Sequence, residues 1–367
     1  MDLEKIKTPM LLLDQKKCEA NIKFMADKAN SLGIEFRPHF KTHQSKIIGN
    51  WFKKQEVKKI TVSSFKMAEY FAADGWNDIT VAFPVNIREI GQINTLSANI
   101  NLNIVLENIE STEFLITHLK NKVGFFIKID TGYGRTGVSF DIFLIIDKIL
   151  KSAELSENLV FKGFLSHSGN TYYAKNIDEI REIHFDSLQK LALLKKQYAG
   201  RYSDLIISVG DTPSCSTLEN FDGIGEIRPG NFVFYDLMQY NLGSCAFDQV
   251  AVAMACPVVA KHADRDEIII YGGAVHFSKE FITINGVKVY GMVVELTESG
   301  WKQMDENNYL VKISQEHGTI KASQSLFEKI KVGGLVGIIP VHSCLTANLM
   351  GKYVTTHEEI IDHFSGK

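Results

Sequence analysis

The hydrophobic pattern of the first two thirds of the chain alternates between short β-rich runs and longer stretches with helical spacing. In the segment 15–32, Ile22, Met25 and Ala29 fall on one helical face, and the segment 178–198 reads as a long helix. The β-rich runs predict eight strands, at 34–40, 60–65, 78–84, 102–108, 124–130, 161–167, 204–210 and 226–236. This succession predicts an α/β fold, a (β/α)8 TIM-like barrel whose active site lies at the C-terminal ends of its strands.

The pattern changes after about residue 246. From there, strand-like runs are joined by turns and show little helical periodicity, which indicates a β-rich domain. We therefore expect a barrel domain over residues 1–245 and a β-rich domain over residues 246–367. The apolar run 8–13 precedes the barrel pattern and is a candidate to pair with the second domain.

Composition narrows the class of protein. The chain has 367 residues, 45% of them hydrophobic, and a formal net charge of −3 with basic residues spread without a run, which argues against nucleic acid or an anionic membrane as partner. The N-terminus lacks a signal-peptide pattern, and no stretch reaches the roughly 18 apolar residues that a membrane span needs. Five widely spaced cysteines form no disulfide framework, so a cytoplasmic location is expected.

Lys41 is the first candidate for chemistry, because it follows the first predicted strand in the string RPHFKTHQ. A lysine in this position can form a Schiff base with pyridoxal phosphate, and a crowded polar setting could lower its pKa enough to make it a base. A solvated surface lysine is the competing interpretation. The barrel prediction favours chemistry, because other polar residues follow strands on the same rim: Ser64, Asn86, Asp130 with Arg135, His167, and the turn 210–214.

The segment PVHSCLTAN near the C-terminus holds a candidate metal pair. If this segment is extended, His342 and Cys344 point to the same side and can bind one cation. An imidazole and a thiolate together suit zinc. A structural zinc would need four ligands, so a buried cysteine beside an incidental histidine is the alternative; a catalytic metal would take its remaining ligands from water and substrate.

Six strings resemble, in order and over nearly the whole chain, the metal-activated, pyridoxal-phosphate-dependent D-serine dehydratases and D-threonine aldolases of the alanine racemase-like fold type III: RPHFKTH, DTGYGRTGV, GFLSHSGNTYY, SVGDTPSC, EIRPGNFVFYD and PVHSCLTAN. The resemblance implies that Lys41 holds the cofactor and that His342 and Cys344 match the metal pair. D-Threonine aldolases usually have aspartate where this chain has Cys344, which favours the dehydratase branch and zinc, with manganese as the alternative. Gln44 stands where many members have lysine.

The resemblance also implies roles for four further residues. His167 matches the histidine that packs against the pyridine ring, and Tyr172 matches an active-site tyrosine near substrate and cofactor. A rim histidine and an aromatic cover of the barrel mouth are the competing interpretations. Arg135 would lie near the phenolic oxygen or the substrate carboxylate, and Arg228 near the ring nitrogen, with a structural ion pair as the alternative for each.

The turn after the seventh predicted strand is a candidate phosphate site. Barrels commonly bind phosphate in their seventh unit through backbone N–H groups and hydroxyls, so Gly210, Thr212 and Ser214 are candidate ligands.

These parts predict a lyase acting on a small β-hydroxy D-amino acid. The freed Lys41 amine would remove the α-proton, the cofactor would delocalise the carbanion, and the metal would stabilise the departing hydroxyl, converting D-serine to pyruvate and ammonia. The same metal contact would serve D-threonine aldolase chemistry. An amino acid racemase needs a second base that the sequence does not nominate. A non-catalytic pyridoxal phosphate carrier would not need the β-domain or the metal pair. The resembled fold usually forms homodimers.

Overall fold

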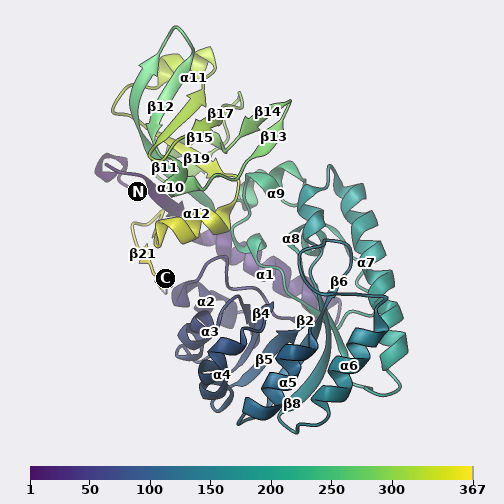
Figure 1. Ribbon diagram of the computed structural model, residues 1–367. Helices are drawn as coiled ribbons and strands as arrows, with labels where there is room; N and C mark the ends of the chain where they lie inside the picture. The colour runs from purple at the N-terminus through teal and green to yellow at the C-terminus, as the bar shows by residue number, and fades with distance from the viewer. Residues whose placement is uncertain (366–367) are drawn as a thin grey trace. The chain divides into compact units, whose positions relative to one another are not determined.

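The computed structural model describes residues 1–365 (Figure 1), and within them the chain forms two discontinuous compact units. The barrel unit contains residues 24–41 and 52–230, and the β-rich unit contains residues 1–23, 42–51 and 231–365. The sequence placed one border after residue 245, whereas the structure groups residues 231–245 with the β-rich unit.

The barrel unit is built on a parallel sheet whose two edges meet (Figure 1). His39 bridges Thr61 in parallel register; the Phe40 amide donates to the Thr61 carbonyl at 2.8 Å, and the Thr61 amide donates to the Pro38 carbonyl at 2.9 Å. The predicted (β/α)8 barrel is therefore confirmed. The strand order is β2 (Glu35–Phe36), β10 (Glu226–Ile227), β9 (Ile206–Val209), β8 (Leu159–Ser166), β6 (Val123–Asp130), β5 (Asn101–Leu106), β4 (Asp78–Pro84) and β3 (Ile60–Val62).

Helices follow the strands of the barrel and flank its sheet (Figure 1). Ser64 caps α3 and Asn108 caps α5 by accepting backbone N–H groups of the first turn, so short polar residues at strand exits start these helices. The helices are α3 (Phe65–Ala72), α4 (Ile90–Ser97), α5 (Ile109–His118), α6 (Phe143–Ala153), α7 (Ile177–Tyr198) and α8 (Thr212–Thr217).

The prediction of one strand over residues 226–236 was wrong beyond Ile227, where β10 ends. Pro229 and Gly230 follow, and proline lacks the N–H that a strand ladder requires. The chain then forms a 3-10 turn at Asn231–Val233, and Asp236 caps α9 (Leu237–Asn241) by accepting the Gln239 amide at 3.0 Å.

The β-rich unit contains a closed antiparallel ring, because β12 pairs with both β18 and β11. Strand β1 (Met10–Leu13) pairs antiparallel with β11 and parallel with β20 in the same unit. This is the run that the sequence marked as a candidate to pair with the second domain. The other strands of this sheet are β11 (Val252–His262), β12 (Glu267–Tyr271), β15 (Gly291–Thr297), β17 (Tyr309–Ile313), β18 (His317–Lys321), β19 (Leu335–Pro340), β20 (Tyr353–Thr355) and β21 (Ile360–Ile361).

Short helices interrupt this unit, among them α10 (Ala274–Phe277), α11 (Gln324–Lys329) and α12 (Ser343–Met350). The strand pattern did not predict them. Across residues 1–365, no helix combines the length and the apolar character that crossing a membrane requires.

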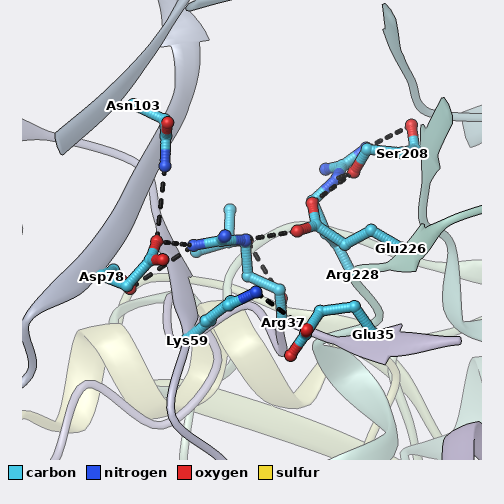
Figure 2. Close-up of polar contacts among 9 residues, drawn as sticks. Glu35, Arg37, Lys59, Asp78, Asn103, Ser208, Glu226 and Arg228 are labelled. Carbon is cyan, nitrogen blue, oxygen red and sulfur yellow. Dashed lines mark hydrogen bonds and ion pairs between the residues drawn. The ribbon is translucent and has the colours of Figure 1, made fainter. Parts of the chain in front are cut away.

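A chain of buried polar contacts lies inside the barrel (Figure 2). Arg37 donates from Nε to Glu226 at 2.6 Å and from Nη1 to Asp78 at 2.6 Å. The Ser208 hydroxyl donates to Glu226 at 2.6 Å and accepts from Arg228 Nε at 2.7 Å. The network therefore links strands β4, β9 and β10 and ends on Arg228, one of the predicted cofactor residues.

We expect Glu226→Ala to lower the free energy of unfolding by about 3–5 kcal/mol, because it removes the more deeply buried of the two carboxylates that pair with the buried Arg37 charge. Glu35 is the matched control: it pairs with Lys59 at 2.8 Å, but both side chains are partly exposed (Figure 2). Glu35→Ala should cost at most about 1 kcal/mol. Urea unfolding of the two variants measures the difference, and equal losses would contradict a structural role for the network.

Candidate active site

Lys41 stands at the C-terminal rim of the barrel, as predicted. The preceding residue, Phe40, is fully buried, and its ring lies 4.9 Å from that of Phe52 and 5.0 Å from that of Trp76. The Lys41 backbone amide donates to His39 Nδ1 at 3.3 Å, while the Lys41 side chain is exposed. The buried aromatic residue thus fixes the backbone from which Lys41 extends.

Two half-buried histidines, His39 and His167, share this rim with Lys41. Burial lowers the pKa of His39 well below 6.5, and the charges of Lys41 and Arg228 lower it further. Burial also lowers the pKa of His167 well below 6.5, with the charge of Lys128 as the next cause. Both imidazoles are therefore neutral at neutral pH.

The tautomer of His167 follows from its partner. Nδ1 hydrogen bonds with the carbonyl oxygen of Gly210, so this nitrogen carries the hydrogen and Nε2 is left as an acceptor. The rings of Tyr133 and Tyr172 lie 6.1 and 6.2 Å from the His167 ring. The structure thus brings two predicted site residues, His167 and Tyr172, together.

Arg135 is carried by a loop that Asp130 organises. The Asp130 carboxylate, at the end of β6, accepts the backbone N–H groups of Gly132 and Tyr133 at 2.9 Å and that of Gly134 at 3.0 Å. The guanidinium of Arg135 then lies 5.1 Å from the centre of the Tyr133 ring, which is cation–π distance. Asp130 therefore orders the loop.

Arg228 is fully enclosed by the barrel. Besides its bond to Ser208, it donates from Nη2 to the Ser166 carbonyl at 2.6 Å. Burial lowers the pKa of Arg228 to about 10, so the guanidinium stays charged at neutral pH. Its direct partners are a hydroxyl and a carbonyl, and the Glu226 carboxylate reaches it through Ser208.

The turn after β9 contains two unsatisfied buried hydroxyls. Within residues 1–365, Thr212 Oγ1 and Ser214 Oγ have no hydrogen-bond partner, although buried polar groups are rarely left unpaired. A Cβ at Gly210 would lie 2.8 Å from the Arg228 backbone, so this close approach requires glycine. The Thr212 amide donates to the Tyr172 hydroxyl at 3.1 Å, so the Tyr172 side chain lies against this turn. The two hydroxyls are therefore available to hydrogen bond with a ligand.

In the β-rich unit, His342 and Cys344 are brought together, but through a different local structure than expected. The prediction of an extended segment was wrong, because β19 ends at Pro340 and α12 begins at Ser343. His342 is the N-cap of α12, and Cys344 lies in the first helical turn. The two side chains still hydrogen bond with each other, because the N-cap residue and the first turn share one face.

The surroundings of this pair are polar. The Thr42 hydroxyl lies 3.3 Å from Cys344 Sγ, and Asn231 Nδ2 donates toward the same sulfur at 3.6 Å. His342 Nδ1 lies 2.5 Å from Glu280 Oε2. Burial favours a lower pKa for His342, but its bonds with Cys344 and Glu280 raise that pKa well above 6.5. In the described part of the chain, no cluster of three or more histidine, cysteine or acidic residues could hold a metal.

Sequence reasoning missed several groups at these sites, among them His39, Lys128, Asn231 and Glu280. His39 stands inside the string RPHFKTH, so the bridge between the first two strands could have identified it. Lys128 is on β6, where side-chain alternation with Asp130 indicated the same face. Nothing in the sequence pairs Glu280 with His342, because 62 positions separate them.

Comparisons with known proteins match both parts of the chain. Residues 13–237 match the family described as "Alanine racemase, N-terminal domain", and residues 251–356 match the "Putative serine dehydratase domain". D-serine dehydratase from Dictyostelium discoideum is 29% identical, with 99% of this chain and 97% of that protein covered. D-threo-3-hydroxyaspartate dehydratase from Delftia sp. (strain HT23) is 26% identical, with coverages of 94% and 93%. The solved structure of the Delftia sp. HT23 enzyme matches with a TM-score of 0.90 at 24% identity, covering 100% and 99% of the chains, which shows the same fold.

Lys128 provides a test of the rim electrostatics. Burial, followed by the charges of Arg228 and Arg135, lowers the pKa of Lys128 from 10.5 to about 7. Between these two pH values the unfolded chain holds a proton on Lys128 that the folded protein lacks, so the free energy of unfolding should increase with pH. The increase attributable to Lys128 should approach about 1.4 kcal/mol per pH unit.

Lys128→Met should remove this increase. Denaturant unfolding of both proteins between pH 7 and pH 10, the range set by the two pKa values, measures the difference in slope. Parallel stability curves would show that Lys128 titrates normally.

Proposed function

The chain belongs to the alanine racemase N-terminal domain family, which its residues 13–237 match, and from this premise we propose that it is a pyridoxal-phosphate- and metal-dependent lyase that converts D-serine to pyruvate and ammonia. The observation that carries the proposal is the pairing of the His342 and Cys344 side chains at the start of α12, where they hydrogen bond with each other. They lie in a segment matched by the serine dehydratase domain, in a chain whose barrel presents Lys41 on its rim. The full-length similarity to D-serine dehydratases supports the choice of substrate.

The residues of the barrel unit fit pyridoxal phosphate. The unsatisfied hydroxyls of Thr212 and Ser214, with the close approach at Gly210, suit its phosphate, and Lys41 supplies the amine that binds its aldehyde. Arg228 remains charged and would face the ring nitrogen. When bound, the cofactor supplies an electron sink for the carbanion formed at the substrate Cα.

The remaining residues of the barrel unit would bind and orient the substrate and the cofactor. The exposed Lys41 would be the base that removes the substrate α-proton. Arg135, held over the Tyr133 ring, would bind the substrate carboxylate. Tyr172, held by the Thr212 amide, and the neutral His167 would line the cofactor site.

The donor set of the β-rich unit fits zinc better than manganese. A thiolate is a soft ligand and an imidazole a borderline one, and both suit zinc. The Asn231 amide donates toward the sulfur, and the Thr42 hydroxyl oxygen lies within hydrogen-bond distance of it. Two protein ligands leave positions for water and for the substrate β-hydroxyl. A zinc ion held there would supply a Lewis acid for the departing hydroxyl.

We also propose a homodimer in the cytoplasm. The resemblance to the dimeric alanine racemase-like fold supports the first part. The five cysteines support the second, because none of them forms a disulfide within the described residues and a reducing compartment keeps thiols reduced.

Borohydride reduction of the cofactor-bound protein should attach the pyridoxyl group to Lys41, because this lysine lies at the rim within the matching motif. Peptide mapping by mass spectrometry locates the label. Lys66 and Lys128 are internal controls in the same unit, and labelling on either would overturn the assignment of Lys41.

Product analysis tests the reaction. The zinc-loaded protein should release pyruvate and ammonia from D-serine, and prolonged treatment with a chelator should abolish this activity, because hydroxide leaves poorly without a Lewis acid. Cys344→Ala should lose metal and activity but keep bound cofactor. Glycine and acetaldehyde from D-threonine without pyruvate from D-serine would indicate an aldolase, conversion of D-alanine to L-alanine a racemase, and no turnover at all a cofactor carrier.

A further inference from the structure

Glu280 contacts the Nδ1 nitrogen of His342. Its Oε2 atom lies 2.5 Å from His342 Nδ1, across 62 positions of sequence. Since Nδ1 is engaged by Glu280, Nε2 is the nitrogen left for Cys344 and for a metal. The contact therefore selects the tautomer and the rotation of the ring.

The backbone around Glu280 is held in place. The Glu280 amide donates to the Ser278 hydroxyl at 3.2 Å, and Ser278 ends α10 with φ of +71°, a conformation that residues other than glycine rarely adopt. The Ser278 amide in turn donates to the Ala274 carbonyl at 2.8 Å. The carboxylate is thus presented from a rigid turn rather than from a mobile loop.

We propose that Glu280 is the positioning residue of the metal pair: it accepts the Nδ1–H of His342 and holds the imidazole so that Nε2 and Cys344 Sγ face the same ion. This inference rests on the metal-dependent function proposed above. A site with only two protein ligands has little geometric redundancy, so an imidazole that rotates freely would lose much of its affinity. Outer carboxylates of this kind typically contribute about 10- to 100-fold in metal affinity.

A second histidine–carboxylate pair in the same unit provides a matched control. His276 Nε2 lies 4.0 Å from Glu316 Oε2, and His276 Nδ1 accepts the backbone amide of Gly273 at 3.1 Å. Glu316→Gln therefore removes a carboxylate charge from beside another imidazole of the same unit and keeps the contact of Glu280 with His342.

The experiment measures zinc affinity by competition with a chromophoric chelator, and the absorption of the cobalt-substituted protein, on the full chain with its cofactor. Glu280→Ala should bind zinc about 100-fold more weakly than the parent and Glu280→Gln about 10-fold more weakly, because glutamine keeps an acceptor oxygen but not the charge. Glu316→Gln should match the parent. At saturating cobalt, the Glu280 variants should retain the thiolate-to-cobalt charge-transfer band, which shows that Cys344 still binds.

The outcomes separate the two proposals. If His342→Ala and Cys344→Ala lose zinc while both Glu280 variants bind within twofold of the parent, the metal site stands and the role of Glu280 is wrong. If the parent binds no zinc, or Cys344→Ala binds it unchanged, the metal-dependent function itself is wrong. Equal losses of zinc affinity in Glu280→Gln and Glu316→Gln would also contradict positioning, because they would reflect a general loss of charge.

Thermal melting of each apo variant verifies that it folds. If Glu280→Ala fails to fold, Glu280→Gln still tests the proposal, because it keeps the size of the side chain.

Discussion

The buried positive charge of Arg37 is the constraint on which the barrel interior depends. A guanidinium with 5% of its side chain exposed must be compensated, and Asp78 and Glu226 do this from strands on either side. Glu226 is shared, because its second oxygen accepts the Ser208 hydroxyl, and Ser208 accepts Arg228. The same compensation that lets the barrel close therefore also fixes the direction of Arg228, so a change in the interior would be transmitted to the rim.

The rim shows the opposite electrostatic situation. His39, His167 and Lys128 all have lowered pKa values, first through burial and then through surrounding positive charge. The causes of these shifts include the positive charges of Lys41, Arg135 and Arg228, so the rim would favour a bound anion. A phosphate or a carboxylate would be such an anion, and the buried hydroxyls of Thr212 and Ser214 in the same unit could donate hydrogen bonds to it.

The sequence predicted what depends on local periodicity. The barrel strands and Lys41 follow from alternation and from the position of a strand exit, and β4 has the predicted bounds 78–84. Properties that depend on distant partners were not predictable. The contact of Arg37 with Glu226 spans 189 positions. His342 and Cys344 lie close enough to hydrogen bond, although the extended conformation assumed for them was wrong, and their binding of a metal stays a prediction. The spacing of two residues serves a strand and a helix N-terminus equally, so spacing alone could not choose.

The incomplete ligand set of the β-rich unit is the strongest physical argument for elimination over racemisation. A racemase needs proton transfer on two faces of Cα and gains nothing from a Lewis acid with open positions. A metal held by one imidazole and one thiolate has free coordination sites, and the group that it can stabilise is an oxygen leaving Cβ. Thiolate donation would moderate the acidity of a bound zinc, so the Asn231 amide, which donates toward the Cys344 sulfur at 3.6 Å, matters. This hydrogen bond would withdraw charge from the sulfur and so favour Lewis acidity toward the departing oxygen.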